Sequence, residues 1–210
     1  MTLRLATEKD LFRLAEIYTL AFPESVTFYY GKDQAKRVQQ LMVPSWQILL
    51  NSGAKIICFG EPVVGYCCYH VEDHLAQRKT FSYTSLQVYY QAFKNGDLQI
   101  SLPEILSLVQ SQFLMKRHYN LKLPIPRGRI LSLAILPDYQ SMGIGRLLLE
   151  KALLDIGNQP VILEVRPENI KAYRLYKSFG FAEKGQTRDL LGSWLIMLKT
   201  KEEISSEERF

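Results

Sequence analysis

The chain has 210 residues, of which 47% are hydrophobic and 22% charged, as expected for one ordinary globular domain with or without an insertion. Its net charge of +5 is modest and its lysines and arginines are scattered, which argues against a nucleic-acid-binding face and against a disordered chain. The sequence shows no apolar stretch long enough for a membrane span and no signal-peptide pattern at its start. We therefore expect a cytoplasmic protein with no membrane partner.

The first part of the chain predicts a strand, two helices and a hairpin. Residues 2–6 alternate in polarity and predict a short strand. Thr7 and the acidic residues after it predict the start of a helix that ends near Pro23. A second helix is expected over about 32–50, and two β-rich runs predict a hairpin over 54–71.

The three cysteines, Cys58, Cys67 and Cys68, lie within this predicted hairpin. They show no CxxC spacing, and the histidines show no pair at metal-ligand spacing. We interpret the cysteines as reduced thiols of the core and expect no bound metal.

Residues 72–126 interrupt this pattern with helical signals of their own. The run at 101–113 places apolar residues at helical spacing behind a serine that can cap a helix. We interpret 72–126 as a helical insertion between the third and fourth strands that helps to wall a substrate site, with a dimer contact or an added core layer as the alternative. The polar tail, 201–210, is expected to be flexible.

The second part of the chain alternates strands and helices before a final pair of strands. The expected strands are at 129–137, 160–166, 181–186 and 193–199, and the expected helices at 140–157 and 168–180. Together with the first part, this order predicts a single domain over 1–200 with an α/β fold, in which helices flank a mixed sheet.

Two glycines, Gly143 and Gly145, stand between a predicted strand and the helix that follows it. The first main-chain N–H groups of a helix have no partner within the helix, and its dipole favours an anion there. Gln140, Ser141 and Arg146 can add side-chain donors to such a site. The alternative is that the glycines only shape a tight turn, because neither a P-loop nor a full GxGxxG pattern is present.

Three polar residues, one in the next strand and two in the helix after it, raise a second candidate site. Glu164 lies inside the apolar run VILEV, where a carboxylate is costly to bury unless it is paired or functional. Asn169 and Tyr176 project from one stripe of the following helix. For Glu164 the structural alternatives are an ion pair with Arg166 or a neighbour, or exposure near the strand end. For Asn169 the alternative is a helix cap, and for Tyr176 it is a core position, with Tyr173 as the rival tyrosine.

The run QSMGIG, which follows LAILPDY, resembles the Q/R-x-x-G-x-G/A motif of the GNAT superfamily of N-acetyltransferases. The predicted order of strands and helices is also similar to that superfamily, whose sheet is mixed and mostly antiparallel. The resemblance implies that the pyrophosphate of coenzyme A lies on this loop. The implied cofactor contacts of the loop are Gln140, Ser141, Met142, Gly143, Ile144, Gly145 and Arg146. It also implies main-chain contacts from the preceding strand to the pantetheine arm, through Ala134, Ile135 and Leu136.

The run LEVRPENIKAYRLYKSFGF resembles a longer GNAT segment and is especially similar to the ribosomal-protein-alanine N-acetyltransferases. This resemblance implies that Glu164 is the catalytic base, that Asn169 binds acetyl-CoA, and that Tyr176 contacts the cofactor and donates a proton.

The function implied is transfer of an acetyl group from acetyl-CoA to a primary amine of a small molecule, peptide or protein. The transfer is expected to be direct, within a ternary complex. Two alternatives stay open: an acyltransferase that prefers a longer acyl group, and an idle acyl-CoA-binding domain that acts through its insertion. We expect acetyl-CoA and an amine as partners, no metal, no nucleic acid, and a monomer or homodimer.

Overall fold

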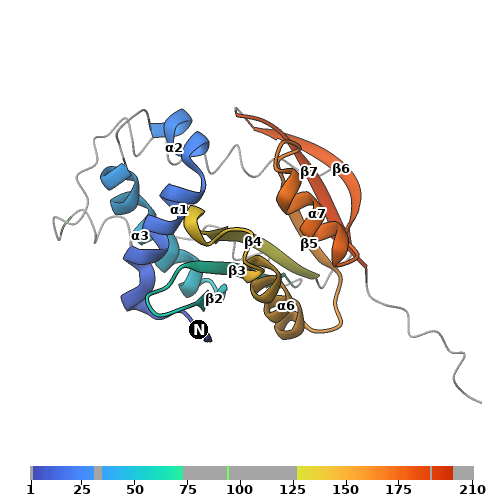
Figure 1. Ribbon diagram of the computed structural model, residues 1–210, viewed down its shortest axis with the longest axis horizontal. Helices are drawn as coiled ribbons and strands as arrows, with labels where there is room; N and C mark the ends of the chain where they lie inside the picture. The colour runs from blue at the N-terminus through green and yellow to red at the C-terminus, as the bar shows by residue number, and fades with distance from the viewer. Residues whose placement is uncertain (1, 31–34, 73–93, 95–126, 190, 201–210) are drawn as a thin grey trace, which may run out of the picture.

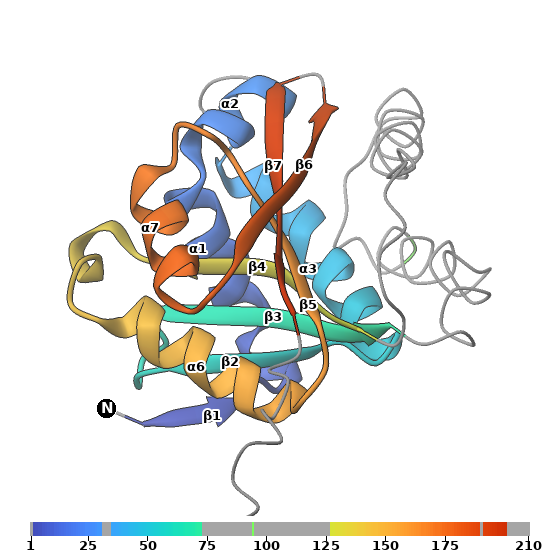
Figure 2. The ribbon, with the colours of Figure 1, turned by 90° about the vertical axis from the view of Figure 1, so that its right-hand side faces the viewer.

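The computed structural model describes residues 2–30, 35–72, 94, 127–189 and 191–200, and shows one mixed sheet with helices on both faces (Figures 1 and 2). The sheet has seven strands in the order β1-β2-β3-β4-β5-β7-β6. Neighbouring strands are antiparallel except β4 and β5, which are parallel. This arrangement confirms the predicted mixed, mostly antiparallel sheet flanked by helices.

The strands are β1 (Leu3–Leu5), β2 (Lys55–Phe59), β3 (Gly65–Glu72), β4 (Arg127–Ile135), β5 (Val161–Val165), β6 (Ala182–Asp189) and β7 (Gly192–Lys199). The helices are η1 (Glu8–Asp10), α1 (Leu11–Ala21), α2 (Pro23–Tyr30), α3 (Ala35–Asn51), η3 (Pro137–Tyr139), α6 (Ile144–Ile156) and α7 (Ile170–Ser178), where η denotes a 3-10 helix.

One helix of the N-terminal half was not predicted. The sequence suggested that the first helix ends near Pro23, and α1 does end at Ala21. Phe22 then leaves the helical conformation, with φ −126° and ψ 55°, and α2 begins at Pro23. Proline is well suited to the first helical position, because the N–H it lacks has no partner there. The same proline therefore follows one helix and starts the next.

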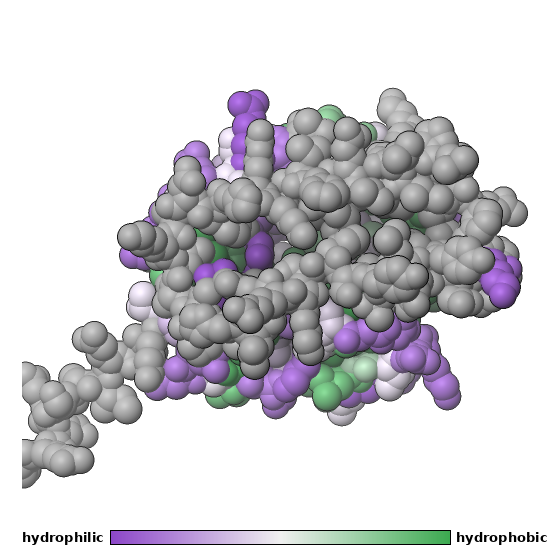
Figure 3. Space-filling model, turned by 180° about the vertical axis from the view of Figure 1, so that it is seen from behind, coloured by the Kyte–Doolittle hydropathy of each residue, from purple (hydrophilic) through white to green (hydrophobic). Residues whose placement is uncertain are grey.

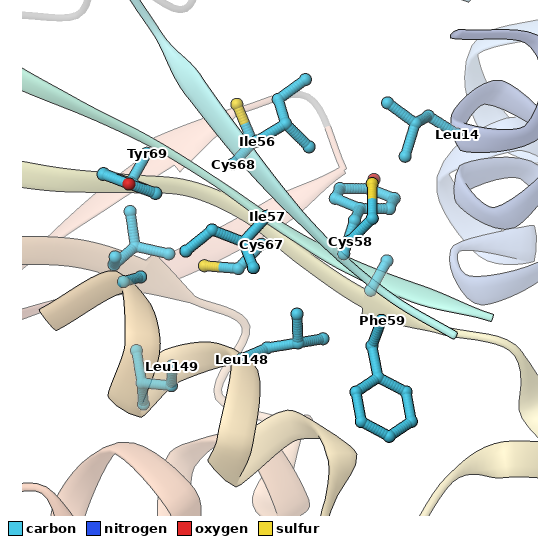
Figure 4. Close-up of a cluster of buried hydrophobic side chains, with 14 of the residues drawn as sticks. Leu14, Ile56, Ile57, Cys58, Phe59, Cys67, Cys68, Tyr69, Leu148 and Leu149 are labelled. Carbon is cyan, nitrogen blue, oxygen red and sulfur yellow. The ribbon is translucent and has the colours of Figure 1, made fainter. Parts of the chain in front are cut away.

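The buried side chains alternate between the two faces of the central strands. Helices α1 and α3 pack on one face and α6 packs on the other. Figure 4 shows Cys58 beside Leu14 of α1, and Cys67 on the side of Leu148 of α6. All three cysteines are buried free thiols, as the sequence predicted. Burial raises the pKa of the Cys58 thiol to about 12, which keeps it protonated and unreactive.

The parallel strands β4 and β5 pair over only a short distance. Their register partners are Gly128 with Val161 and Arg129 with Ile162. Beyond that point β4 continues along β3 as far as Ile135, while β5 continues along β7. The two strands thus pair at one end and separate at the other. On that side, main-chain groups of β4 have no partner strand among the described residues.

Most of the predicted insertion at 72–126 and all of the predicted tail at 201–210 lie outside the described residues. The last residue of β3 and the first of β4, Glu72 and Arg127, are register partners in the sheet. Where Figure 3 shows described residues, hydrophilic and hydrophobic side chains lie side by side. Within the described parts of the chain, no helix combines the length and apolar character that a membrane crossing requires.

Candidate active site

The loop between β4 and α6 has an unusual main-chain conformation. Ser141 has a φ of 64° and Gly143, the N-cap of α6, has a φ of 79°. A Cβ atom added to Gly143 would meet nothing within 4 Å, so this position requires glycine for its left-handed conformation and not for space. A Cβ added to Gly145 would lie 3.2 Å from Cδ1 of Ile135. Gly145 therefore lets the first turn of α6 approach the end of β4.

This loop presents a row of main-chain donors. The N–H groups of Arg146 and Leu147 both donate to the carbonyl of Gly143, at 3.0 and 3.2 Å. Among the described residues, the N–H groups of 141–145 donate to no protein acceptor. Residues 141–143 are exposed. The start of α6 thus offers several N–H groups, together with the positive end of the helix dipole, to a bound anion.

The polar side chains of the loop brace it against its neighbours. Gln140 Nε2 donates to the carbonyl of Ile135 at 3.2 Å. Arg146 Nη2 donates to Ser178 Oγ at 3.0 Å, and its guanidinium lies 4.9 Å from the ring centre of Phe179. These bonds connect the loop to β4 and to the end of α7. Two of the three side chains suggested by the sequence as extra phosphate donors, Gln140 and Arg146, therefore have protein partners in this structure.

The main-chain groups of β4 divide between its two edges. The N–H of Leu136 donates to Val64 at 2.9 Å, and its carbonyl accepts from Tyr139 at 2.9 Å. Because main-chain groups alternate along a strand, those of Ala134 also face β3, while those of Leu133 and Ile135 face the β5 side. Of the three predicted main-chain contacts, Ile135 is the one whose groups point toward the parting of β4 and β5.

Glu164 lies on the sheet face opposite α7. Its neighbours in β5, Leu163 and Val165, join the main core, whereas Ile162 shares the face of Glu164 and belongs to a separate apolar cluster. The carboxylate accepts a 2.8 Å hydrogen bond from Nη2 of Arg129 on β4, and each of the two side chains is 26% exposed. The ion pair suggested as the structural alternative is therefore present.

Asn169 caps its own helix. Its side-chain oxygen accepts a hydrogen bond from the N–H of Ala172 at 3.1 Å, which is the usual role of an asparagine at this position. The residue is exposed. The predicted cap is confirmed, while a contact with acetyl-CoA stays a prediction.

The two tyrosines of α7 face different surroundings. Tyr176 is 6% exposed, and its ring lies 5.9 Å from that of Phe181 in the core. Burial raises the pKa of the Tyr176 hydroxyl well above its usual value, because the charged form is poorly solvated there. Tyr173 instead donates a 2.6 Å hydrogen bond to Glu183 Oε1 on β6.

Glu164 and Tyr176 consequently lie on opposite faces of the sheet. Tyr176 belongs to the same buried cluster as Leu163 and Val165, and the side chains of those residues point away from the face of Glu164. Figure 2 shows α6 and α7 on one side of the strands and α1 and α3 on the other. A molecule that reaches both residues has to pass where β4 and β5 part.

The sequence suggested an ion pair of Glu164 with Arg166 or a neighbour, and the structure shows Arg129 as the partner. Arg129 is 35 residues away along the chain, so no local pattern links the pair. Arg166, which shares the face of Glu164, donates from Nη2 to both oxygens of Asp189 at 2.9 and 2.8 Å. Its guanidinium lies 3.9 Å from the ring centre of Trp194. The alternation of Glu164 and Arg166 had suggested a pair between these two residues, whereas Arg166 pairs with Asp189.

Comparison with known proteins agrees with this geometry. Residues 110–181 match the model of the acetyltransferase (GNAT) family, so the match begins inside the predicted insertion. An N-alpha-acetyltransferase of Sulfurisphaera tokodaii is 44% identical over 71 residues, which are 30% of this chain and 42% of that protein. A ribosomal protein bS18-alanine N-acetyltransferase of Salmonella typhimurium is 40% identical over 62 residues, 28% of this chain and 42% of that protein. The chain thus spans about two fifths of the length of these curated relatives.

Solved structures support the fold over most of the chain. An acetyltransferase of Corynebacterium glutamicum, described with histone acetyltransferase, superposes with a TM-score of 0.65 at 16% identity, covering 97% of this chain and 98% of that one. A GNAT superfamily phosphinothricin acetyltransferase of Sinorhizobium meliloti, solved in complex with acetyl-CoA, gives 0.58 at 15% identity, covering 95% and 88%. The family match over 110–181 and the fold shared with these acetyltransferases agree with the resemblance to the GNAT superfamily seen in the sequence.

Proposed function

We propose that this protein is an acetyl-CoA-dependent N-acetyltransferase that acts on a primary amine. One observation carries the proposal: the N–H groups of residues 141–145, which donate to no acceptor in the described part of the chain, stand at the start of α6, directly after the strand that parts from β5. The GNAT family match and the relatives named as N-acetyltransferases support it.

In this proposal the pyrophosphate of coenzyme A binds to the N–H groups of the loop from Ser141 to Gly145. Its pantetheine arm extends along the edge of β4 that faces β5, where it forms hydrogen bonds with the main-chain groups of Ile135. Asn169, at the start of α7, contacts acetyl-CoA in this proposal. The thioester then lies between the two faces of the sheet, with Glu164 on one side and Tyr176 on the other.

The proposed reaction follows from that placement. A neutral amine approaches from the side of Glu164 and attacks the thioester carbonyl, and the carboxylate of Glu164 accepts the proton lost by the amine. The carbon–sulfur bond breaks, and the hydroxyl of Tyr176 gives its proton to the departing thiolate. The high pKa of this buried hydroxyl keeps it protonated until then. No covalent enzyme intermediate is needed.

The acceptor class is a primary amine of a small molecule or of a peptide or protein. The relatives named for N-alpha- and alanine acetylation support an α-amino group. Such a group has a pKa near 7.7–8.0, against about 10.4 for lysine, so it reaches the neutral form with less help from a base. We therefore expect peptides with an unblocked N-terminus to be better acceptors than lysine side chains.

Thiol release from acetyl-CoA tests the proposal over a panel of small amines and peptides, with mass spectrometry of the products. We expect amine-dependent release and an acetylated product, and the Glu164→Gln variant should lose most of the turnover while keeping its affinity for acetyl-CoA. A series of longer acyl-CoA donors then establishes the chain length preferred. Binding of acetyl-CoA without transfer to any amine in the panel would favour an idle acyl-CoA-binding domain.

A further inference from the structure

The ion pair between Arg129 and Glu164 lies at the point where two strands separate. Arg129 belongs to the last register pair of β4 with β5, and its partner there is Ile162. Glu164 is the next residue of β5 whose side chain faces the same side of the sheet. The 2.8 Å bond between Arg129 Nη2 and Glu164 Oε1 therefore crosses from one strand to the other just beyond their last main-chain pairing.

Three arginines share the sheet face of Glu164. Its cross-strand partner in β7 is Ile196, which is apolar. By register and alternation, the charged or titratable residues of β3 and β4 on this face are Tyr66, Cys68, His70, Glu72, Arg127 and Arg129, and Arg166 follows directly after β5. In β6 and β7, Asp189 lies on this face and is engaged by Arg166 and by the indole N–H of Trp194.

We propose that Arg129 is a positioning residue for Glu164, which holds the carboxylate ionised and directed toward the acceptor where β4 and β5 part. This inference rests on the proposed function, because it assigns Arg129 a role in the proton transfer through Glu164. Arg129 itself touches neither the acceptor nor acetyl-CoA.

Two physical effects link the guanidinium to the reaction. A cation within hydrogen-bond distance favours the ionised carboxylate, so the pair keeps Glu164 able to accept a proton at lower pH. The bond also restricts the rotamers of a flexible side chain, and small displacements of a reacting group are costly in rate. Removing the charge should therefore change both the pH profile and the rate, whereas a purely structural ion pair would change only stability.

The test compares Arg129→Met, which removes the charge, with Arg129→Lys, which keeps it. The acid limb of kcat/KM, measured against pH, should move upward by about one pH unit or more in Arg129→Met and stay near that of the wild type in Arg129→Lys. Consequently, the activity deficit of Arg129→Met should be largest at low pH and shrink as pH rises. A positional deficit of at least about tenfold should remain at the plateau.

A matched control removes an ion pair of similar exposure elsewhere. Arg13 and Glu16 of α1 lie 2.6 Å apart with exposures of 31% and 36%, so Arg13→Gln should leave the pH profile unchanged. Thermal unfolding and the dissociation constant for acetyl-CoA report whether each variant is folded. Should Arg129→Met fail to fold, Arg129→Lys still tests the inference, since a shifted acid limb in a folded lysine variant contradicts it.

A second measurement does not depend on enzymatic activity. NMR titration of ¹³C-labelled glutamate carboxyl groups, assigned with Glu164→Gln, should show the Glu164 carboxyl titrating at higher pH in Arg129→Met than in the wild type. An unchanged titration together with an unchanged pH–rate profile overturns the role of Arg129 and leaves the proposed acetyltransferase intact. A wild-type protein that acetylates no amine overturns the proposed function, and the role of Arg129 in it.

Discussion

Tyr176 and Tyr173 differ in what their hydroxyl groups can do, although both belong to α7. Tyr173 is bound to Glu183, and this hydrogen bond raises the pKa of its hydroxyl. Tyr176 is buried beside the core of the sheet, on the face opposite Glu164. The proposed reaction therefore assigns protonation of the departing thiolate to Tyr176 and not to Tyr173.

The matched variants Tyr176→Phe and Tyr173→Phe test this assignment. Each keeps the ring and removes one oxygen, so packing is largely retained. General acid catalysis is typically worth about 10²–10⁴-fold, and we expect kcat of Tyr176→Phe to fall within that range while Tyr173→Phe stays near the wild type. Calorimetry with acetyl-CoA separates binding from chemistry. The reverse ranking of the two variants would transfer the role to Tyr173.

Gly143 offers a second test at the residue scale, because another glycine of the chain has a similar main-chain conformation and can serve as a control. Gly53 also has a left-handed φ, 89° against 79°, and an added Cβ meets nothing at either site. Alanine at either position should therefore cost about 1 kcal/mol of stability. We expect only Gly143→Ala to raise the Kd for acetyl-CoA, since only its strain reorients the N–H groups of the loop. Equal affinities of the two variants for acetyl-CoA would contradict the assignment of this loop to the cofactor site.

At the scale of elements, one carboxylate connects β1 to the start of α1. Asp10 accepts hydrogen bonds from Nη1 and Nη2 of Arg4, both at 2.8 Å, and from the N–H of Thr7 at 2.8 Å. The bond to Arg4 outweighs the effect of burial and lowers the pKa of Asp10 to about 2. The ionised form thus stabilises the folded protein.

The sign of the pH dependence follows from that lowered pKa. In the unfolded chain Asp10 titrates near 3.9, so its stabilising effect is complete above that pH and is lost as pH falls toward 2. Asp10→Asn should reduce the free energy of unfolding by up to about 2 kcal/mol at neutral pH, and the two proteins should converge between about pH 4 and pH 2. Urea unfolding at several pH values measures the difference. A gap that persists at pH 2 would mean that geometry and not charge carries the effect.

At the scale of the whole molecule, the described sheet should fold without the long segment between β3 and β4. Glu72 and Arg127 are register partners, and antiparallel partners lie only about 4.5–5.5 Å apart, so a short Gly/Ser turn can join them. Replacing residues 73–126 in this way should leave a folded protein that binds acetyl-CoA with wild-type affinity.

Calorimetry and circular dichroism of the shortened protein check this outcome, and the amine panel then shows what the segment contributes. The sequence predicted that the insertion helps to wall the acceptor site. That expectation requires amine turnover to fall while the affinity for acetyl-CoA survives. An unchanged kcat/KM for the same amine contradicts it, and loss of acetyl-CoA binding contradicts the independence of the sheet.

Much of this protein was determined by the sequence because the relevant interactions are local. The alternation of β5, the glycines before α6 and the asparagine cap of α7 each depend on residues within a turn or two of one another. The same short-range patterns produced the resemblance to the GNAT motifs. That resemblance indicated the loop, Glu164 and Tyr176 as candidate site residues. Local patterns also placed the buried cysteines in the core strands.

The tertiary structure decided what lies across space from these residues. The bond of Glu164 to Arg129 joins positions 35 residues apart, and it depends on the register of β4 with β5. The placement of Glu164 and Tyr176 on opposite faces depends on which side of the sheet α7 packs. Register and packing side follow from the burial of the whole apolar surface at once, which no local stretch of sequence encodes.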